Sequence, residues 1–165
     1  MVYKCKWFTL KELVSPAVYA RFGEFAWYFL DEGMKKDIDI LREFIWGRSL
    51  TINNYAWGGT YKESGLRCNT DSIVKAKKTP YLSGHVLGRA FDIKPENLKD
   101  VPELFKKIQL NFHKLSTVSR MESLKSAPTW IHLDNLGADA LYLIDDQNPA
   151  NEDAVIKLIK AAHSK

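Results

Sequence analysis

Apolar residues recur at helical spacing in three parts of the chain. The longest stripe has members three or four residues apart: Met34, Ile38, Leu41 and Ile45. Such spacing places them on one buried face of a helix, and Gly47 is a typical residue to end it. A second stripe lies within residues 100–115, where Pro102 suits the first turn of a helix. A third, within residues 155–162, predicts a final helix that packs on the domain.

Alternating apolar and polar residues predict strands over residues 49–55, 89–93, 117–122 and 129–134. The last two are separated by a short loop and are expected to form a hairpin. A capping pattern that begins at Thr9 adds a short helix near the start of the chain. These elements predict an α+β fold, in which a small antiparallel sheet is flanked by helices.

The composition is that of a globular protein. Of the 165 residues, 45% are hydrophobic and 27% are charged, which is enough to bury a core and predicts a single domain over residues 1–165. The net charge of +4 suits an anionic partner. Lysine and arginine are scattered, however, and do not form a basic stripe with interleaved aromatic residues, which argues against a nucleic-acid partner.

The cysteines and the start of the chain indicate a reducing compartment. Cys5 and Cys68 do not make a disulfide framework, and both are expected to be free thiols. The first residues lack the apolar segment of a signal peptide, and no apolar run approaches membrane-spanning length. We therefore expect cytoplasmic synthesis without a signal peptide and no membrane partner.

Two of the predicted strands carry metal-binding side chains on the face opposite the core. Side chains alternate along a strand, so the apolar neighbours of Asp92 and of His132 point inward and these two residues point outward. Trp130 and Asp134 share the outward face with His132. Each strand thus combines a buried apolar face with a face that is able to bind a metal.

His85 joins this set only if the chain turns. It lies seven residues before Asp92, an odd number, so one regular strand would place the two side chains on opposite faces. Gly84 and Gly88 supply the backbone freedom for a turn. Taken singly, each residue is more simply a loop histidine or a strand-end carboxylate. Together with His132 they match an open catalytic Zn²⁺ site, in which two imidazoles and one carboxylate leave a position for water.

A water bound to such a metal also needs a general base close by. Glu122 ends the first strand of the predicted hairpin, and strand pairing brings it beside the strand of His132. Asp134 is the competing candidate, and we favour Glu122. Arg67, in the polar and glycine-rich loop over residues 58–67, is either a functional guanidinium or a solvated loop residue.

The metal motif resembles that of a known family. Ser83-x-His85-x-x-Gly88-x-Ala90-x-Asp92, followed by Trp130-x-His132, is similar to the zinc peptidases of the D-Ala-D-Ala carboxypeptidase family, whose fold is shared with the hedgehog signalling domain. The segments 8–14 and 64–67 also resemble small phage and bacterial members, so the likeness extends from about Phe8 to Asp134.

The resemblance implies roles for the site residues. His85, Asp92 and His132 would bind Zn²⁺, Arg67 would steady a substrate carbonyl or carboxylate, and the substrate site would be lined by Ser83, Trp130 and Asp134. Many relatives carry the catalytic glutamate three residues before the last histidine, where this chain has Thr129. Others carry an acidic residue further upstream, which Glu122 matches.

The function implied by the resemblance is hydrolysis of peptide bonds in peptidoglycan stem peptides, by a carboxypeptidase or endopeptidase of D,D- or L,D-type. Because that polymer lies outside the membrane, a phage or prophage lysin that is released or carried by the virion would fit the missing signal peptide. Two alternatives stay open: a non-catalytic zinc module of the same fold that acts in structure or partner binding, and a virion structural protein.

Overall fold

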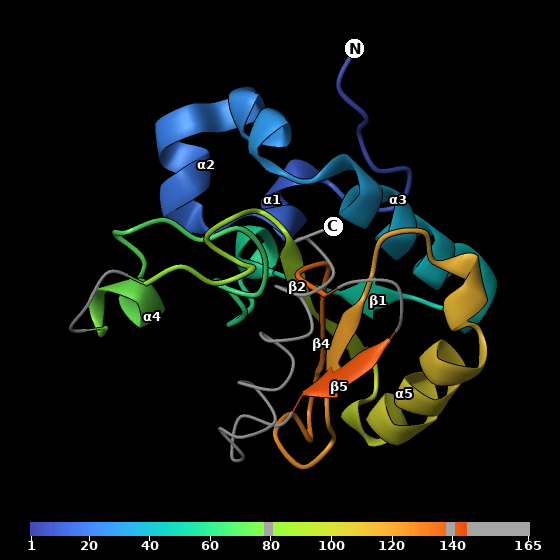
Figure 1. The fold of residues 1–165 in the computed structure, drawn as a ribbon. Helices are drawn as coiled ribbons and strands as arrows, with labels where there is room; N and C mark the ends of the chain where they lie inside the picture. The colour runs from blue at the N-terminus through green and yellow to red at the C-terminus, as the bar shows by residue number, and fades with distance from the viewer. Residues whose placement is uncertain (78–80, 138–140, 145–165) are drawn as a thin grey trace, which may run out of the picture.

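The computed structural model describes residues 1–77, 81–137 and 141–144, in which helices surround one five-stranded sheet (Figure 1). The α+β class is therefore confirmed. The helix expected within residues 155–162 lies outside the described residues. In the described part of the chain, no helix combines the length and the apolar character needed to cross a membrane.

The sheet is mixed, and its strand order is β1-β2-β4-β3-β5. The strands are β1 Leu50–Thr51, β2 Ala90–Pro95, β3 Arg120–Glu122, β4 Ile131–Asp134 and β5 Tyr142–Ile144. The β1–β2, β2–β4 and β3–β4 pairs are antiparallel, and the last of these is the predicted hairpin, whereas β5 runs parallel to β3.

The prediction of a purely antiparallel sheet was therefore wrong at one edge. Both edges of β4 are already occupied, by β2 and β3, so the strand that follows β4 joins the sheet at the outer edge of β3. A strand that reverses direction after β4 runs antiparallel to β4, and for that reason parallel to β3.

The strand expected over residues 49–55 is also shorter than the pattern indicated. Only Leu50–Thr51 pairs with β2. Two residues further on, the backbone N–H of Asn53 donates to the carbonyl of Glu12, and its side-chain amide donates to the carbonyl of Val14. This part of the chain thus leaves the sheet to hold the segment that follows the first helix.

The α-helices are α1 Leu10–Leu13, α2 Pro16–Phe22, α3 Glu32–Ile40, α4 Ser72–Lys75 and α5 Val101–Leu110. The 3₁₀ helices are η1 Gly23–Phe29, η3 Tyr55–Trp57, η4 Leu98–Asp100 and η5 Phe112–Lys114, and α3 continues into a π-helical turn, η2 Leu41–Trp46. The α3–η2 unit is the predicted long helix. It ends at Gly47, whose φ of 73° is left-handed.

The core lies against the apolar face of the sheet. The predicted inward residues of β2 and β4 are all at most 1% exposed: Phe91, Ile93, Ile131 and Leu133. Helix α5 contacts both strands and buries Leu104 and Ile108 completely. Because this face is covered by helices, the polar residues of the same strands are left together on the opposite face.

One buried carboxylate of α3 binds the residues that precede β3. Asp37 is 1% exposed and accepts hydrogen bonds from the backbone N–H groups of Ser116, Thr117 and Val118, at 2.7 to 2.8 Å. It also accepts from the hydroxyls of Ser116 and Thr117. One carboxylate thus serves three consecutive backbone donors, of which the N–H of Val118 is buried and needs a partner within the protein.

Both cysteines are partly buried and neither forms a disulfide, as the sequence indicated. Burial raises the pKa of the Cys5 thiol far above its ordinary value, and the nearby Asp39 carboxylate acts in the same direction. Cys5 is therefore a neutral, unreactive thiol at physiological pH.

Candidate metal centre

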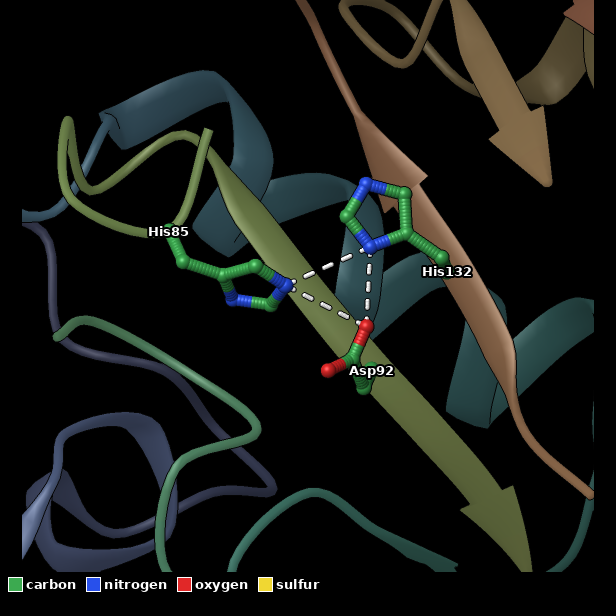
Figure 2. Close-up of side chains that lie close together, drawn as sticks. All are labelled: His85, Asp92 and His132. Atoms are coloured by element: carbon green, nitrogen blue, oxygen red, sulfur yellow. Dashed lines mark hydrogen bonds and ion pairs between the residues drawn. The ribbon is translucent and has the colours of Figure 1, made fainter. Parts of the chain in front are cut away.

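The structure brings His85, Asp92 and His132 together on the polar face of the sheet (Figure 2). The Nε2 atom of His85 lies 3.3 Å from Nδ1 of His132 and 3.2 Å from Oδ1 of Asp92. The Nδ1 atom of His132 lies 2.8 Å from the same carboxylate oxygen. In the described part of the chain this is the one group of at least three histidine, cysteine or acidic side chains whose ligand atoms converge in this way.

These separations fit a zinc ion. In a tetrahedral site with Zn–N and Zn–O bonds of about 2.0 Å, ligand atoms lie roughly 3.3 Å apart. Two of the three distances, 3.3 and 3.2 Å, agree with that value, and the third, 2.8 Å, needs only a small outward shift. Three ligands leave a fourth tetrahedral position free.

Strand pairing places two of the ligands. Asp92 of β2 and His132 of β4 are direct partners in the antiparallel register, so their side chains project side by side from one face. The third, His85, reaches the site from the loop before β2, as Figure 2 shows.

The expected turn between His85 and Asp92 is present. The backbone N–H of Leu87 donates to the carbonyl of Ser83, and that of Arg89 donates to the carbonyl of Gly84. Gly88 has a φ of 69°, and a Cβ at this position would collide with the carbonyl oxygen of Phe29. The glycine is thus required both by backbone conformation and by close packing.

The segment over residues 64–67 forms the other wall of the site. The backbone N–H of Asp92 donates to the Ser64 carbonyl, and that of Arg67 donates to the His85 carbonyl. The Nδ1 atom of His85 lies 2.9 Å from the carbonyl oxygen of Gly65. Because a carbonyl only accepts, Nδ1 carries the proton and Nε2 keeps the lone pair that faces the other ligands.

Asp134 fixes the proton position on His132 in the same way. Its Oδ2 lies 3.1 Å from Nε2 of His132, which therefore carries a proton and leaves Nδ1 as the ligand atom. Arg120 holds the carboxylate with two hydrogen bonds of 2.7 Å, and the backbone N–H of Leu136 adds a third. Burial alone would raise the pKa of Asp134, but hydrogen bonds from His132 and Arg120 outweigh it and hold that pKa well below its ordinary value.

This arrangement changes the interpretation of Asp134. The side chain is fully buried, and its oxygens are engaged by His132, Arg120 and Leu136. It therefore does not offer the substrate contact that the motif suggested, nor is it placed to act as the competing general base. It is a positioning residue that orients His132 from behind.

Asp134→Asn is accordingly expected to lower Zn²⁺ affinity by about 10- to 100-fold, as is typical when a partner of a metal-bound histidine is replaced. Competition with a chelating fluorophore measures the change. Glu96→Gln, an exposed site just after β2, is the matched control and should bind as the unmodified protein does. Unchanged affinity in Asp134→Asn would show that the carboxylate does not set the orientation of the ring.

Arg67 is not a solvated loop residue. Its side chain is only 9% exposed, and Nη2 donates to Oδ2 of Asp92 at 3.0 Å. Its Nε donates to the carbonyl of Glu63. The guanidinium thus holds the carboxylate oxygen that faces away from the histidines, which leaves Oδ1 for the metal.

The two histidines differ in their protonation. Burial lowers the pKa of His85, and the neighbouring Asp92 only partly opposes this effect. Burial acts on His132 too, but its hydrogen bonds to Asp134 and Asp92 outweigh it and raise its pKa to about 10. Burial by itself would also raise the pKa of Asp92, yet the adjacent His85 and His132 bring it well below its ordinary value.

Zinc binding at neutral pH is therefore expected to release one proton. Below a pKa of about 10, His132 carries a proton on Nδ1 that must leave before this atom binds the metal, whereas His85 is already neutral and Asp92 is ionised. Affinity should rise about tenfold per pH unit between roughly pH 7 and 9. Isothermal titration calorimetry in buffers of different ionisation enthalpy counts the protons, and a count of zero or two would contradict this assignment.

A cavity of about 600 Å³ opens beside the ligands. Its walls include Arg67, Asp92 and Trp130. Trp130, which the motif suggested as a substrate contact, thus lines a cavity that Asp92 also lines. Ser83 is not among the residues that line this cavity, and its hydroxyl instead accepts a long hydrogen bond, 3.4 Å, from the backbone N–H of Val86 in the turn.

Glu122 lies on β3, on the face that carries the site. Arg120 and Glu122 are two residues apart and project from the same side of the sheet, and Arg120 is the partner of Asp134 in the β3–β4 register. If the β3–β4 register is extended by one residue pair, Glu122 lies opposite His132. Thr129, the position of the glutamate in many members of the family that the motif resembles, is exposed at the wall of the cavity.

Lys94 also belongs to the surroundings of the site, although no sequence motif indicated it. This lysine is 6% exposed, lines the cavity, and lies two residues after Asp92 on the same strand. The two-residue period of the strand was sufficient to place it on the site face. Burial lowers its pKa to about 8, an effect that Asp92 opposes and Arg67 reinforces, so the amine is mostly protonated at pH 7.

No protein-family model matches this chain, and neither a curated protein nor a solved structure matches it. The inference of function therefore rests on the metal centre and on the motif.

Proposed function

We propose that the protein is a zinc-dependent peptidase that hydrolyses peptide bonds of peptidoglycan stem peptides. One observation carries the proposal: three ligand atoms face one another at 2.8 to 3.3 Å, at the edge of a cavity large enough for a peptide segment. Each ligand is held in orientation by a partner outside the set: Gly65 for His85, Arg67 for Asp92 and Asp134 for His132.

The ligand set favours catalysis over a purely structural metal. Structural zinc sites in proteins are closed by four protein ligands, whereas catalytic sites have three and keep one position open. Here three ligands converge, and Asp92 also lines the cavity. A substrate in the cavity would thus lie beside a residue that would hold the metal.

The chain's own residues would divide the chemistry among them. His85, Asp92 and His132 would hold Zn²⁺, which when bound polarises a carbonyl and lowers the pKa of water. Arg67 lines the cavity and would steady a carbonyl or carboxylate of the substrate. Glu122 is proposed as the general base that takes the proton of the attacking water and returns it to the leaving amine.

The proposed substrate and the proposed fold family are both based on the motif. The Ser83–Asp92 and Trp130–His132 segments resemble those of the D-Ala-D-Ala carboxypeptidase family, so we propose the hedgehog/DD-peptidase fold and cell-wall peptides as substrates. A role as a phage or prophage lysin, which reaches the wall after release or with the virion, belongs to the same proposal.

The test is digestion of purified peptidoglycan by zinc-loaded protein, with the released fragments identified by mass spectrometry. We expect new peptide termini, their loss on chelation, and no release by His85→Ala. His113→Ala, which replaces an exposed histidine on η5, should retain full activity and serves as the matched control. Tight zinc binding without any new termini would instead favour the non-catalytic zinc module.

A further inference from the structure

Lys94 places a buried positive charge at the wall of the cavity without a carboxylate to neutralise it. Its Nζ donates to the Ser64 hydroxyl at 2.9 Å and to the backbone carbonyl of Asp92 at 3.1 Å. Both acceptors are neutral oxygens. The ammonium also lies 4.6 Å from the centre of the Tyr61 ring. Among the described residues, none contributes a carboxylate within ion-pair distance of this lysine.

The acidic side chains nearby are already engaged. Glu63 also lines the cavity, but its carboxylate accepts hydrogen bonds from the backbone N–H groups of Ser72 and Ile73 and from the Ser72 hydroxyl. Asp92 directs one oxygen to the histidines and the other to Arg67. Neither carboxylate is therefore available to Lys94.

The cavity consequently carries an excess of positive charge. Three cationic side chains line it, Lys62, Arg67 and Lys94, against two carboxylates, Glu63 and Asp92, which leaves a balance of +1. A bound Zn²⁺ would raise this to +3. A buried cation without a counter-ion is costly, and an anionic group that enters the cavity removes that cost.

Donors remain for such a group. An ammonium has three N–H donors, and the described residues accept two hydrogen bonds from Lys94. A guanidinium has five, and the described residues accept two from Arg67, through Nε and Nη2. Both residues are in contact with Asp92 and both line the same cavity.

We propose that Lys94 and Arg67 form a carboxylate-binding subsite next to the metal centre, so that the preferred substrates are peptides with a free carboxylate close to the bond that is cut. This rests on the proposed peptidase function and adds the chemistry by which the substrate is selected. Lys94 acts as a specificity-determining residue, while the reacting bond lies over the metal ligands.

The carboxylate has two sources in a stem peptide: the C-terminus of the chain, or the free α-carboxylate of a γ-linked glutamate within it. Two peptide pairs distinguish them. The first is N-acetyl-D-alanyl-D-alanine and its C-terminal amide. The second is N-acetyl-L-alanyl-γ-D-glutamyl-L-lysine amide with either an α-carboxylate or an α-amide on the glutamate. The members of each pair differ in one charge and hardly in size.

The experiment measures binding and cleavage of both pairs by zinc-loaded protein. Binding is measured by isothermal titration calorimetry, in the Glu122→Gln background wherever the peptide is hydrolysed, and cleavage by mass spectrometry. We expect the acid of at least one pair to bind about 10- to 100-fold more tightly than its amide, as a charge-assisted hydrogen bond implies. Lys94→Met should reduce this preference to within about threefold and leave affinity for the amide nearly unchanged.

Lys62→Met is the matched control, because it removes an exposed lysine from the wall of the same cavity. It should keep the acid preference. A purely structural role of Lys94 would weaken acid and amide binding alike, so the ratio of the two affinities separates the roles.

The outcomes are distinct. Equal binding of acid and amide by the unmodified protein, for both pairs, overturns the subsite even if Lys94→Met fails to fold. An acid preference that persists in Lys94→Met overturns the role of this lysine. A preference that Lys94→Met abolishes, together with no new peptide termini from peptidoglycan, supports the subsite and refutes the peptidase function.

Discussion

Glu122→Gln is expected to reduce the turnover of peptidoglycan peptides by about 10²- to 10⁴-fold, the range in which a general base usually contributes. The substitution keeps the shape of the side chain but removes its ability to take a proton. Glu122 projects from the same face of the sheet as Asp134 and His132, but it does not belong to the group of converging ligand atoms. Zinc content and affinity should therefore stay unchanged.

The comparison with Asp134→Asn makes this test specific. That variant should bind zinc more weakly and recover its turnover when zinc is saturating, because Asp134 orients His132 and is shielded from the cavity by its own burial. Glu122→Gln should show the reverse, with full zinc binding and low turnover at every zinc concentration. Full turnover in Glu122→Gln would refute its role as the base.

Asp37→Ala is expected to destabilise the protein by about 3 to 5 kcal/mol, which is among the larger effects of a single substitution. The carboxylate is 1% exposed and accepts five hydrogen bonds, three of them from consecutive backbone N–H groups. Its removal takes away the shared acceptor of all five hydrogen bonds, each of which contributes about 1 kcal/mol, and leaves the backbone N–H of Val118 buried without a partner.

Thermal unfolding followed by circular dichroism measures this effect, which should lower the Tm by roughly 10 °C for a chain of this length. Glu32→Ala is the control on the same helix. Glu32 forms an i,i+4 ion pair with Lys36 in which both side chains are about half exposed, and its loss should leave the Tm nearly unchanged. Similar losses in the two variants would contradict the role of Asp37.

Periodicity predicted the elements whose residues interact locally. The stripe from Met34 to Ile45 is buried as the spacing indicated, with each of its four members at most 6% exposed. Strand alternation likewise assigned the inward and outward sides of β2 and β4. Helical spacing and strand alternation both reflect which face of an element meets the core, so they can be recognised without knowledge of the rest of the fold.

The sequence by itself also determined the three candidate ligands. Asp92 and His132 appear on outward faces by alternation alone, and the glycines around His85 marked the turn that brings it to them. The sequence did not determine the edges of the sheet, because β5 pairs with β3 and not with β4, the strand that precedes it in the chain.

Only the tertiary structure decided what surrounds the ligands. Asp134, itself held by Arg120, forms a hydrogen bond with His132, and Arg67 binds the second oxygen of Asp92. Lys94 places a positive charge at the cavity without a paired carboxylate from the described part of the chain. Apart from the contact between His132 and Asp134, which are two positions apart, these roles depend on contacts between residues 14 to 30 positions apart in the chain. A local pattern specifies the direction of a side chain from its strand, but its partner is set by how the strands and loops pack together.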